Sequence, residues 1–190
     1  MTPQERQRQR RNRLALLGIF AFFFGSMLIA GLLRFSGWRP EGLKSHGTIL
    51  NPVLDARTLA PSTVDGRQYA WNPKDRRWRM LVVNGATCEA ACESFAADLD
   101  KVWQLLGQNK DRVDVLWMGA TPSKTQVHNL YPISSDASLR SVLPADGQAP
   151  TTKGMPVYIV DPNGFIMMQF PPGTDVSGIR ADFAKVLKLI

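Results

Sequence analysis

One uninterrupted apolar stretch constrains this chain more than any other feature. Residues 14–33 read LALLGIFAFFFGSMLIAGLL, twenty residues without a charged side chain. As a helix rising about 1.5 Å per residue, the stretch spans roughly 30 Å, the thickness of the hydrocarbon core of a bilayer. A cleaved signal peptide is the alternative, but its apolar region is usually only about 7–15 residues long. We therefore expect residues 14–33 to form an uncleaved transmembrane helix.

The charges on either side of this helix predict the topology of the chain. Residues 1–13 form an Arg-rich tail with five arginines and one glutamate. The positive-inside rule places this tail in the cytoplasm and the rest of the chain across the membrane. Residues 34–47 predict a juxtamembrane linker rich in Gly, Pro and charge, and residues 48–190 an exported domain. We expect a single-pass protein of the bacterial inner membrane with a periplasmic C-terminal domain.

The distribution of charge excludes one class of partner. Of the formal net charge of +7, four charges lie in residues 1–13 and three are spread over the remainder. A domain so close to neutral has no strongly basic surface. We therefore expect no nucleic-acid partner.

The apolar pattern of the exported part predicts an α/β domain. Apolar runs typical of buried strands occur at residues 80–83, 113–118, 155–160 and 165–170. Helical periodicity predicts helices over residues 95–106 and 175–190. The first strand–helix–strand unit implies a right-handed crossover and a parallel pair, and the turn at residues 161–164 implies a hairpin. This order, with an irregular insert in the middle, is that of a thioredoxin-like fold, a mixed sheet flanked by helices.

Less regular segments carry further expectations. Residues 48–60 predict a short opening strand, residues 64–83 a hairpin around the NPKD turn, and residues 138–142 a short helix. A cluster of basic residues surrounds the NPKD turn: Lys74, Arg76, Arg77 and Arg79. We expect a solvated edge strand there, with contact to anionic lipid or an acidic partner as the alternative.

The two cysteines, Cys88 and Cys92, are too few for a disulfide scaffold and call for a specific explanation. Their C-x-x-x-C spacing follows a buried strand and opens a helix, with Thr87 as the expected cap. A helix N-terminus stabilises a thiolate, and residues four apart share a helix face.

In an oxidising compartment such a pair is either a disulfide or a soft-metal site, for which two thiolates favour Cu(I). The alternatives are two buried thiols that pack as small apolar groups, or a purely structural disulfide, although so short a loop constrains the unfolded chain only modestly. The neighbouring Glu89 and Glu93 are expected to raise the pKa of the thiols.

Four features together resemble the Sco/SenC family of membrane-anchored, thioredoxin-fold proteins that assist copper delivery to cytochrome c oxidase. They are the N-terminal apolar helix, MLVVNGATCEAACESF, RVDVLWMG and VYIVDPNGFIMMQF. The resemblance covers residues 48–190. It implies that Cys88 and Cys92 act as one site.

Two departures from the family pattern bear on the chemistry. Glu89 stands where the family usually has proline, and the stretch TKGMP at residues 152–156 lacks the histidine that serves as third copper ligand. His128 and Met155 are the candidate replacements as ligands. Gly-Met-Pro also resembles the cis-proline loop of thioredoxins, which makes Pro156 a candidate cis-proline facing the cysteines.

These features support three hypotheses. The first is a Sco-like protein that assists assembly of a respiratory haem-copper oxidase, by handling Cu(I) or by thiol redox chemistry on an oxidase subunit. The second is a membrane-tethered thiol–disulfide oxidoreductase acting on another exported protein, with Cys88 attacking and Cys92 resolving. The third is a non-catalytic accessory subunit of a membrane complex.

Overall fold

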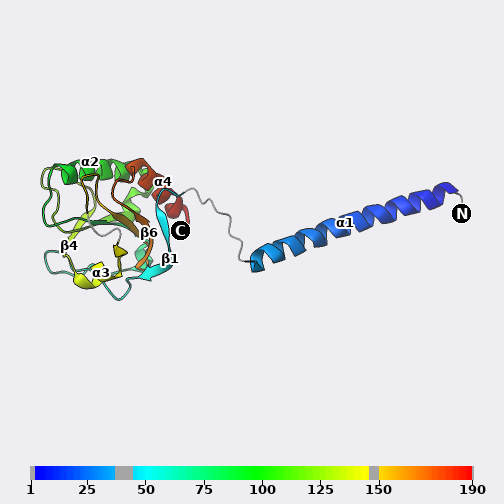
Figure 1. The fold of residues 1–190 in the computed structure, drawn as a ribbon, viewed down its shortest axis with the longest axis horizontal. Helices are drawn as coiled ribbons and strands as arrows, with labels where there is room; N and C mark the ends of the chain where they lie inside the picture. The colour runs from blue at the N-terminus through cyan, green and yellow to red at the C-terminus, as the bar shows by residue number, and fades with distance from the viewer. Residues whose placement is uncertain (1–2, 37–44, 146–149, 190) are drawn as a thin grey trace. The chain divides into compact units, whose positions relative to one another are not determined.

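The computed structural model describes residues 3–36, 45–145 and 150–189. The chain divides into two units, Met1–Leu43 and Lys44–Ile190, which are drawn together in Figure 1. The described residues of the first unit form the helix α1 (Pro3–Phe35). Within the described residues, the segment Arg10–Phe35 of this helix is the one stretch long and apolar enough to cross a membrane.

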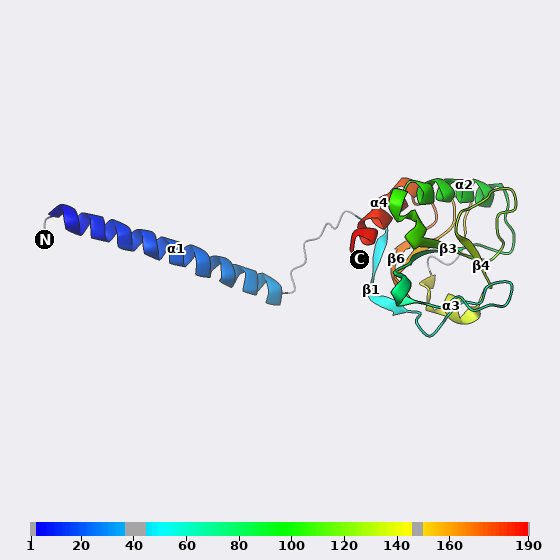
Figure 2. The same ribbon diagram turned by 180° about the vertical axis from the view of Figure 1, so that it is seen from behind.

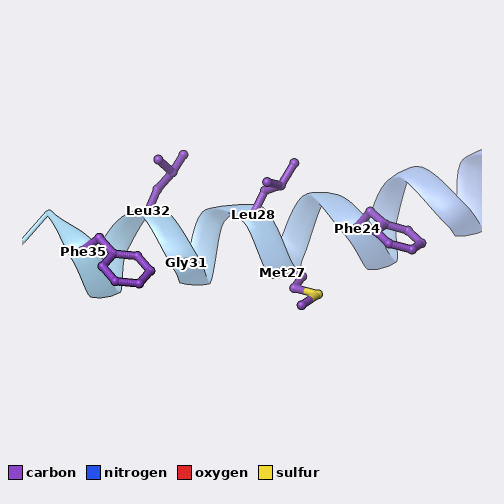
Figure 3. Close-up of a pocket in the computed structure, with 6 residues that line it drawn as sticks. All are labelled: Phe24, Met27, Leu28, Gly31, Leu32 and Phe35. Atoms are coloured by element: carbon purple, nitrogen blue, oxygen red, sulfur yellow. The ribbon is translucent and has the colours of Figure 1, made fainter.

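Beyond its Arg-rich start, α1 has an apolar surface that is exposed in this unit. Figure 3 shows Phe24, Met27, Leu28, Leu32 and Phe35 projecting outward from the helix, with no polar side chain among the residues drawn. Exposed apolar surface of this extent is unfavourable in water but matches the hydrocarbon of a bilayer. The helix is therefore suited to anchor the chain in a membrane.

In the described residues of the second unit, six strands form a mixed sheet with the order β1-β6-β5-β2-β3-β4. Its strands are β1 (Thr48–Asp55), β2 (Trp78–Val83), β3 (Val113–Met118), β4 (Leu130–Ile133), β5 (Val157–Val160) and β6 (Phe165–Phe170). The pairs β2–β3 and β3–β4 are parallel, whereas β5 and β6 run antiparallel to their neighbours.

Helices cover the sheet on both sides. In Figures 1 and 2, α2 (Ala90–Gln104) and α4 (Val176–Val186) lie on one side of the sheet and α3 (Ala137–Val142) on the other. The predicted β-α-β, insert, β-β-α order and the thioredoxin-like fold are confirmed.

The apolar runs of the central strands reflect burial on both faces. All six residues of β2 are buried, as are all six of β3. Alternate residues enter opposite cores: Met80 and Val82 join the cluster beneath α2 and α4, while Leu81 and Val83 join the cluster on the α3 side. Side chains of successive strand residues point to opposite faces, so a doubly covered strand is apolar throughout.

The prediction of a hairpin over residues 64–83 is wrong. The NPKD segment forms a 3₁₀ turn (Pro73–Asp75) whose Asn72 side chain accepts a hydrogen bond from the Lys74 amide. The chain before it forms an isolated bridge between Ser62 and Gln68 in place of a strand. β2 therefore finds its partners in β3 and β5, distant in sequence, and it is central in the sheet.

Arg79 overturns the expectation of a solvated basic edge. It lies in β2 with 1% of its surface exposed. Its guanidinium donates to Tyr69 Oη at 3.0 Å and to the carbonyl oxygens of Asp161 and Pro162, each at 3.1 Å. Because every donor of a buried cation needs an acceptor, these contacts explain how a central strand accommodates an arginine.

A buried carboxylate extends this network. Asp114 of β3 accepts hydrogen bonds from Tyr69 Oη and from Arg77 Nη1, the latter at 2.7 Å. Burial and the hydrogen bond to Asp114 raise the pKa of Tyr69, so its hydroxyl stays protonated and links the aspartate to Arg79.

The start of the second unit is fastened to α4. The backbone N–H groups of His46 and Gly47 both donate to Oδ2 of Asp182, which has 2% of its surface exposed. Oδ1 of the same carboxylate accepts from Lys185 Nζ at 2.8 Å. One buried aspartate therefore holds the chain where it enters the domain.

Arg79 gives a test of this architecture. We expect Arg79→Met to lower the free energy of unfolding by about 3 kcal/mol, because it strands buried acceptors that the guanidinium satisfies. Arg76→Met, at an exposed arginine three positions earlier, is the matched control and is expected to change stability by less than about 0.5 kcal/mol. Urea denaturation followed by circular dichroism measures both, and equal effects would contradict the buried network.

Candidate redox site

The structure joins the two cysteines. Cys88 and Cys92 form a disulfide with their Cα atoms 5.2 Å apart. The pair lies between the end of β2 and the first turn of α2. The predicted pairing of these residues at a strand–helix junction is therefore present in the structure.

The start of α2 differs from the expected one. Its N-cap is Glu89, whose side chain makes no capping hydrogen bond, so the expected cap at Thr87 is wrong. Cys88 precedes the helix and Cys92 lies in its first turn, so the two do not share a helical face. The sulfurs meet because the chain bends into the helix between them. Only Cys92 therefore lies among the unpaired N–H groups of the helix start.

The two sulfur-bearing residues differ in exposure. Cys92 has 3% of its surface exposed and belongs to the core cluster beneath α2, whereas Cys88 is half-buried and packs at the margin of that cluster. A reagent from outside therefore has access to Cys88, and Cys92 is shielded by the core.

Asn84 is a site residue that the sequence analysis missed. It directly follows β2, is 2% exposed, and points its side-chain amide at the disulfide. Nδ2 donates to Cys92 Sγ at 3.2 Å and to the Ala120 carbonyl oxygen at 2.6 Å, with a longer contact of 3.4 Å to the Thr87 carbonyl. A polar residue placed directly after a buried strand and before the cysteines is the signal in the sequence that could have found it.

The backbone around Asn84 continues the β2–β3 pairing past both strands. The Asn84 amide donates to the Met118 carbonyl oxygen at 2.8 Å, and the Ala120 amide donates to the Gly85 carbonyl oxygen at 2.9 Å. Gly119, between them, has φ +96°, and a Cβ there would lie 2.5 Å from the Asn84 carbonyl oxygen. Only glycine fits this crossing, which brings the chain after β3 against the cysteine site.

Glu93 fastens a loop over the start of α2. Its Oε1 accepts from the backbone amides of Ser123 at 2.7 Å and Lys124 at 3.0 Å. The hydrogen bond from the Lys124 amide, supported by that from Ser123, lowers the pKa of Glu93 to about 2. The carboxylate is thus ionised at neutral pH and engaged by the 123–124 loop.

The expected cis bond at Pro156 is wrong. Among the described residues the cis peptide bond is Asn51–Pro52, and Met155–Pro156 is trans. A turn closed by two hydrogen bonds between Thr151 and Gly154 already reverses the chain before this point. The segment then continues extended into β5, with the Pro156 carbonyl accepting from the Val83 amide at 3.1 Å.

This pairing places Met155 beside the end of β2. Met155 is 4% exposed and shares the core cluster of Cys92, against which Cys88 packs. Its thioether therefore lies in the same core as the cysteine pair, which fits ordinary packing and keeps Met155 as a candidate soft ligand.

His128 is not part of the cysteine site, so the expectation of a third ligand there is wrong. Its Nδ1 lies 2.9 Å from Asp100 Oδ1, and its ring stacks on Trp103 with centroids 5.1 Å apart. Asp100 is two helical turns beyond Cys92, about 12 Å along α2. Within the described part of the chain, no group of three or more His, Cys, Asp or Glu side chains is placed to hold a metal.

A family model agrees with this description. The model described as "Transmembrane-like, thioredoxin-like, C-terminal domain" matches residues 78–190. A search of curated proteins by sequence finds no match.

Solved structures with the same fold include Sco proteins. The solution structure of the apo Sco1 protein from Thermus thermophilus is 14% identical with a TM-score of 0.52, over 78% of this chain and 100% of that one. Copper-bound ScoI of Arabidopsis thaliana is 13% identical with a TM-score of 0.46, over 77% and 100%. Bacterioferritin comigratory protein of Xanthomonas campestris is 15% identical with a TM-score of 0.46, over 70% and 92%. At 14% identity the likeness to the Sco1 protein shows the fold alone, in agreement with the thioredoxin-like family model.

Glu93 predicts a pH dependence of stability. Its folded pKa of about 2 lies below the ordinary 4.5. Its contribution is therefore fully present above about pH 4.5 and is lost as the pH falls from there towards 2. We expect Glu93→Gln to be less stable than the wild type at pH 7 and to approach it at pH 2, as measured by urea denaturation at both pH values.

Hydrogen exchange locates the same effect. In Glu93→Gln the amides of Ser123 and Lys124 should exchange faster at pH 7, because their acceptor has lost its charge. Glu89→Gln is the matched control, since that exposed side chain makes no capping bond and should leave these amides protected. Unchanged protection in Glu93→Gln would contradict the role assigned to this carboxylate.

Proposed function

Since the chain belongs to the family described as transmembrane-like, thioredoxin-like, C-terminal domain, we propose that it is a membrane-anchored, Sco-like protein that exchanges disulfides with a protein partner. The observation that carries the proposal is the asymmetric pair, with the half-buried Cys88 bonded to the buried Cys92 at the start of α2. A structural disulfide has no need of an accessible sulfur, whereas an exchanging one requires it.

The exchange proceeds in two balanced steps. A thiolate of the partner attacks Cys88 Sγ, the Cys88–Cys92 bond breaks, and its electron pair leaves on Cys92 as a thiolate. A second partner thiolate then attacks the mixed disulfide, forms a disulfide within the partner and releases the Cys88 thiolate. The pair gains two electrons, the partner loses two, and the protons of the partner thiols pass to solvent or to the released cysteines. The reverse sequence reduces a partner disulfide.

The location and the client are part of the proposal. Residues 14–33 anchor the chain in the bacterial inner membrane, residues 1–13 stay in the cytoplasm, and the chain beyond α1 leads to a periplasmic domain that begins with the segment fastened to α4 at His46 and Gly47. The run of arginines and the apolar α1 support this topology. The client is a subunit of a respiratory haem-copper oxidase whose thiols require redox control, supported by the Sco-like sequence features.

Handling of Cu(I) is a second candidate, favoured by the sulfur-rich surroundings of the site. Reduction of the disulfide frees two thiolates, and the thioether of Met155 lies in the same core. Thiolate and thioether sulfur are the ligands that select Cu(I). The imidazole that the Sco resemblance implies has no counterpart here, because His128 is held by Asp100.

Trapping identifies the exchange reaction. We expect Cys92→Ser in the full-length chain to accumulate mixed disulfides through Cys88, because the resolving sulfur is absent. Cys88→Ser is the matched control and should accumulate far fewer, since Cys92 is buried. Non-reducing electrophoresis followed by mass spectrometry of the adducts measures both. Absence of adducts in Cys92→Ser, together with full function of the double serine variant, would favour a non-catalytic accessory subunit.

Anaerobic Cu(I) titration of the reduced chain tests the copper candidate. We expect His128→Ala to bind as the wild type does, because the His128 side chain contacts Asp100, which lies two turns of α2 beyond Cys92. Met155→Leu should bind more weakly if its thioether is a ligand, and Cys88→Ser/Cys92→Ser should lose the site. Wild-type binding no tighter than that of the double variant would exclude Cu(I) handling by this pair.

A further inference from the structure

The side-chain amide of Asn84 faces one sulfur of the disulfide from within the core. Its Nδ2 donates to Cys92 Sγ at 3.2 Å, and Asn84 is 2% exposed. Cys92 is the less accessible of the two cysteines, so attack from outside falls on Cys88 and the bonding electrons collect on Cys92. The amide therefore points at the atom on which negative charge develops during exchange.

We propose that Asn84 stabilises the Cys92 thiolate and thereby makes Cys92 the leaving group when the disulfide is opened, an inference that rests on the proposed exchange function. The sulfur of a disulfide is a weak hydrogen-bond acceptor, whereas a thiolate carries a full charge. A hydrogen bond to a charged acceptor is roughly twice as strong as a neutral one, and burial strengthens it further. The contact therefore favours the reduced pair over the oxidised pair.

The amide is held in place before any charge appears. Its second hydrogen bond, to the Ala120 carbonyl oxygen at 2.6 Å, fixes the plane of the side chain. The backbone of Asn84 is fixed as well. Its backbone N–H donates to the Met118 carbonyl oxygen, and Gly119 packs closely against its carbonyl oxygen. A donor already oriented towards a developing charge needs no reorganisation during the reaction.

The structure also supplies a control for a merely structural role of Asn84. The Ala120 carbonyl oxygen accepts a second hydrogen bond, from Trp117 Nε1 at 2.8 Å. Trp117→Phe removes a contact to the same carbonyl, retains an aromatic ring, and leaves the amide–sulfur contact in place. If the redox equilibrium depends on how firmly the Ala120 carbonyl is held, Trp117→Phe should shift it. If the equilibrium depends on the Asn84–Cys92 contact, Trp117→Phe should leave it unchanged.

The experiment measures the redox equilibrium of the full-length chain in detergent against glutathione at pH 7. We expect Asn84→Ala to shift the equilibrium at least tenfold towards the disulfide, which is about 30 mV more negative for a two-electron couple. Asn84→Ser, whose hydroxyl can donate, should recover part of the shift, and Trp117→Phe should stay at the wild-type value. An Asn84→Ala value equal to wild type, or an equal shift in Trp117→Phe, would overturn the proposal.

A second measurement tests whether the Cys92 thiolate is stabilised at all, even where an Asn84 variant fails to fold. In Cys88→Ser, the absorbance of the Cys92 thiolate near 240 nm should appear well below pH 8.5, the ordinary midpoint for cysteine. Titration at or above that pH would overturn the proposal. Both measurements use the purified chain without a protein partner, so a failure here is distinct from failure to trap a partner, which bears on the exchange function itself.

Discussion

The backbone pairing that continues past the ends of β2 and β3 is the constraint on which the site depends. Parallel strands end at the same edge of a sheet, and here two further hydrogen bonds, at Asn84 and Ala120, keep the chains together beyond it. This continuation places the side-chain amide of Asn84 in contact with Cys92 Sγ. It also brings the chain after β3 to Glu93, where the Ser123 N–H donates to the carboxylate. The site thus derives its rigidity from two strands that are buried along their whole length.

Sequence reasoning succeeded where a signal is local and periodic. The buried strands, the two long helices and the Asp161–Gly164 turn follow from apolar spacing and turn chemistry, and together they sufficed for the thioredoxin-like fold. β4, with the sequence LYPI, was missed because it is short, contains a proline and has a half-exposed pattern. The prediction of a hairpin at residues 64–83 was wrong because the sequence of a strand does not show which strand it will pair with, even where a turn precedes it.

The remaining misses concern partners that are remote in sequence. Arg79 was assigned to a solvated edge from its basic neighbours, but its acceptors are Tyr69 and two carbonyl groups more than eighty residues away. His128 is a candidate ligand by residue type, and nothing in the neighbouring sequence indicates that Asp100, 28 residues earlier, holds it. The cysteine pair was identified correctly from its spacing, whereas the amide that contacts it is defined by tertiary structure.

The fastening of residues 46–47 to Asp182 has a mechanical consequence. A protein tethered by its N-terminal end receives any pull at the point where the tether joins the folded domain. Here that point is the buried carboxylate of Asp182 on α4. It accepts hydrogen bonds from the backbone N–H groups of His46 and Gly47 and is itself paired with Lys185. The tension is therefore passed to a helix packed on the core before it reaches β1, an edge strand whose one neighbour in the sheet is β6. The edge strand is thereby protected from being peeled off its neighbour.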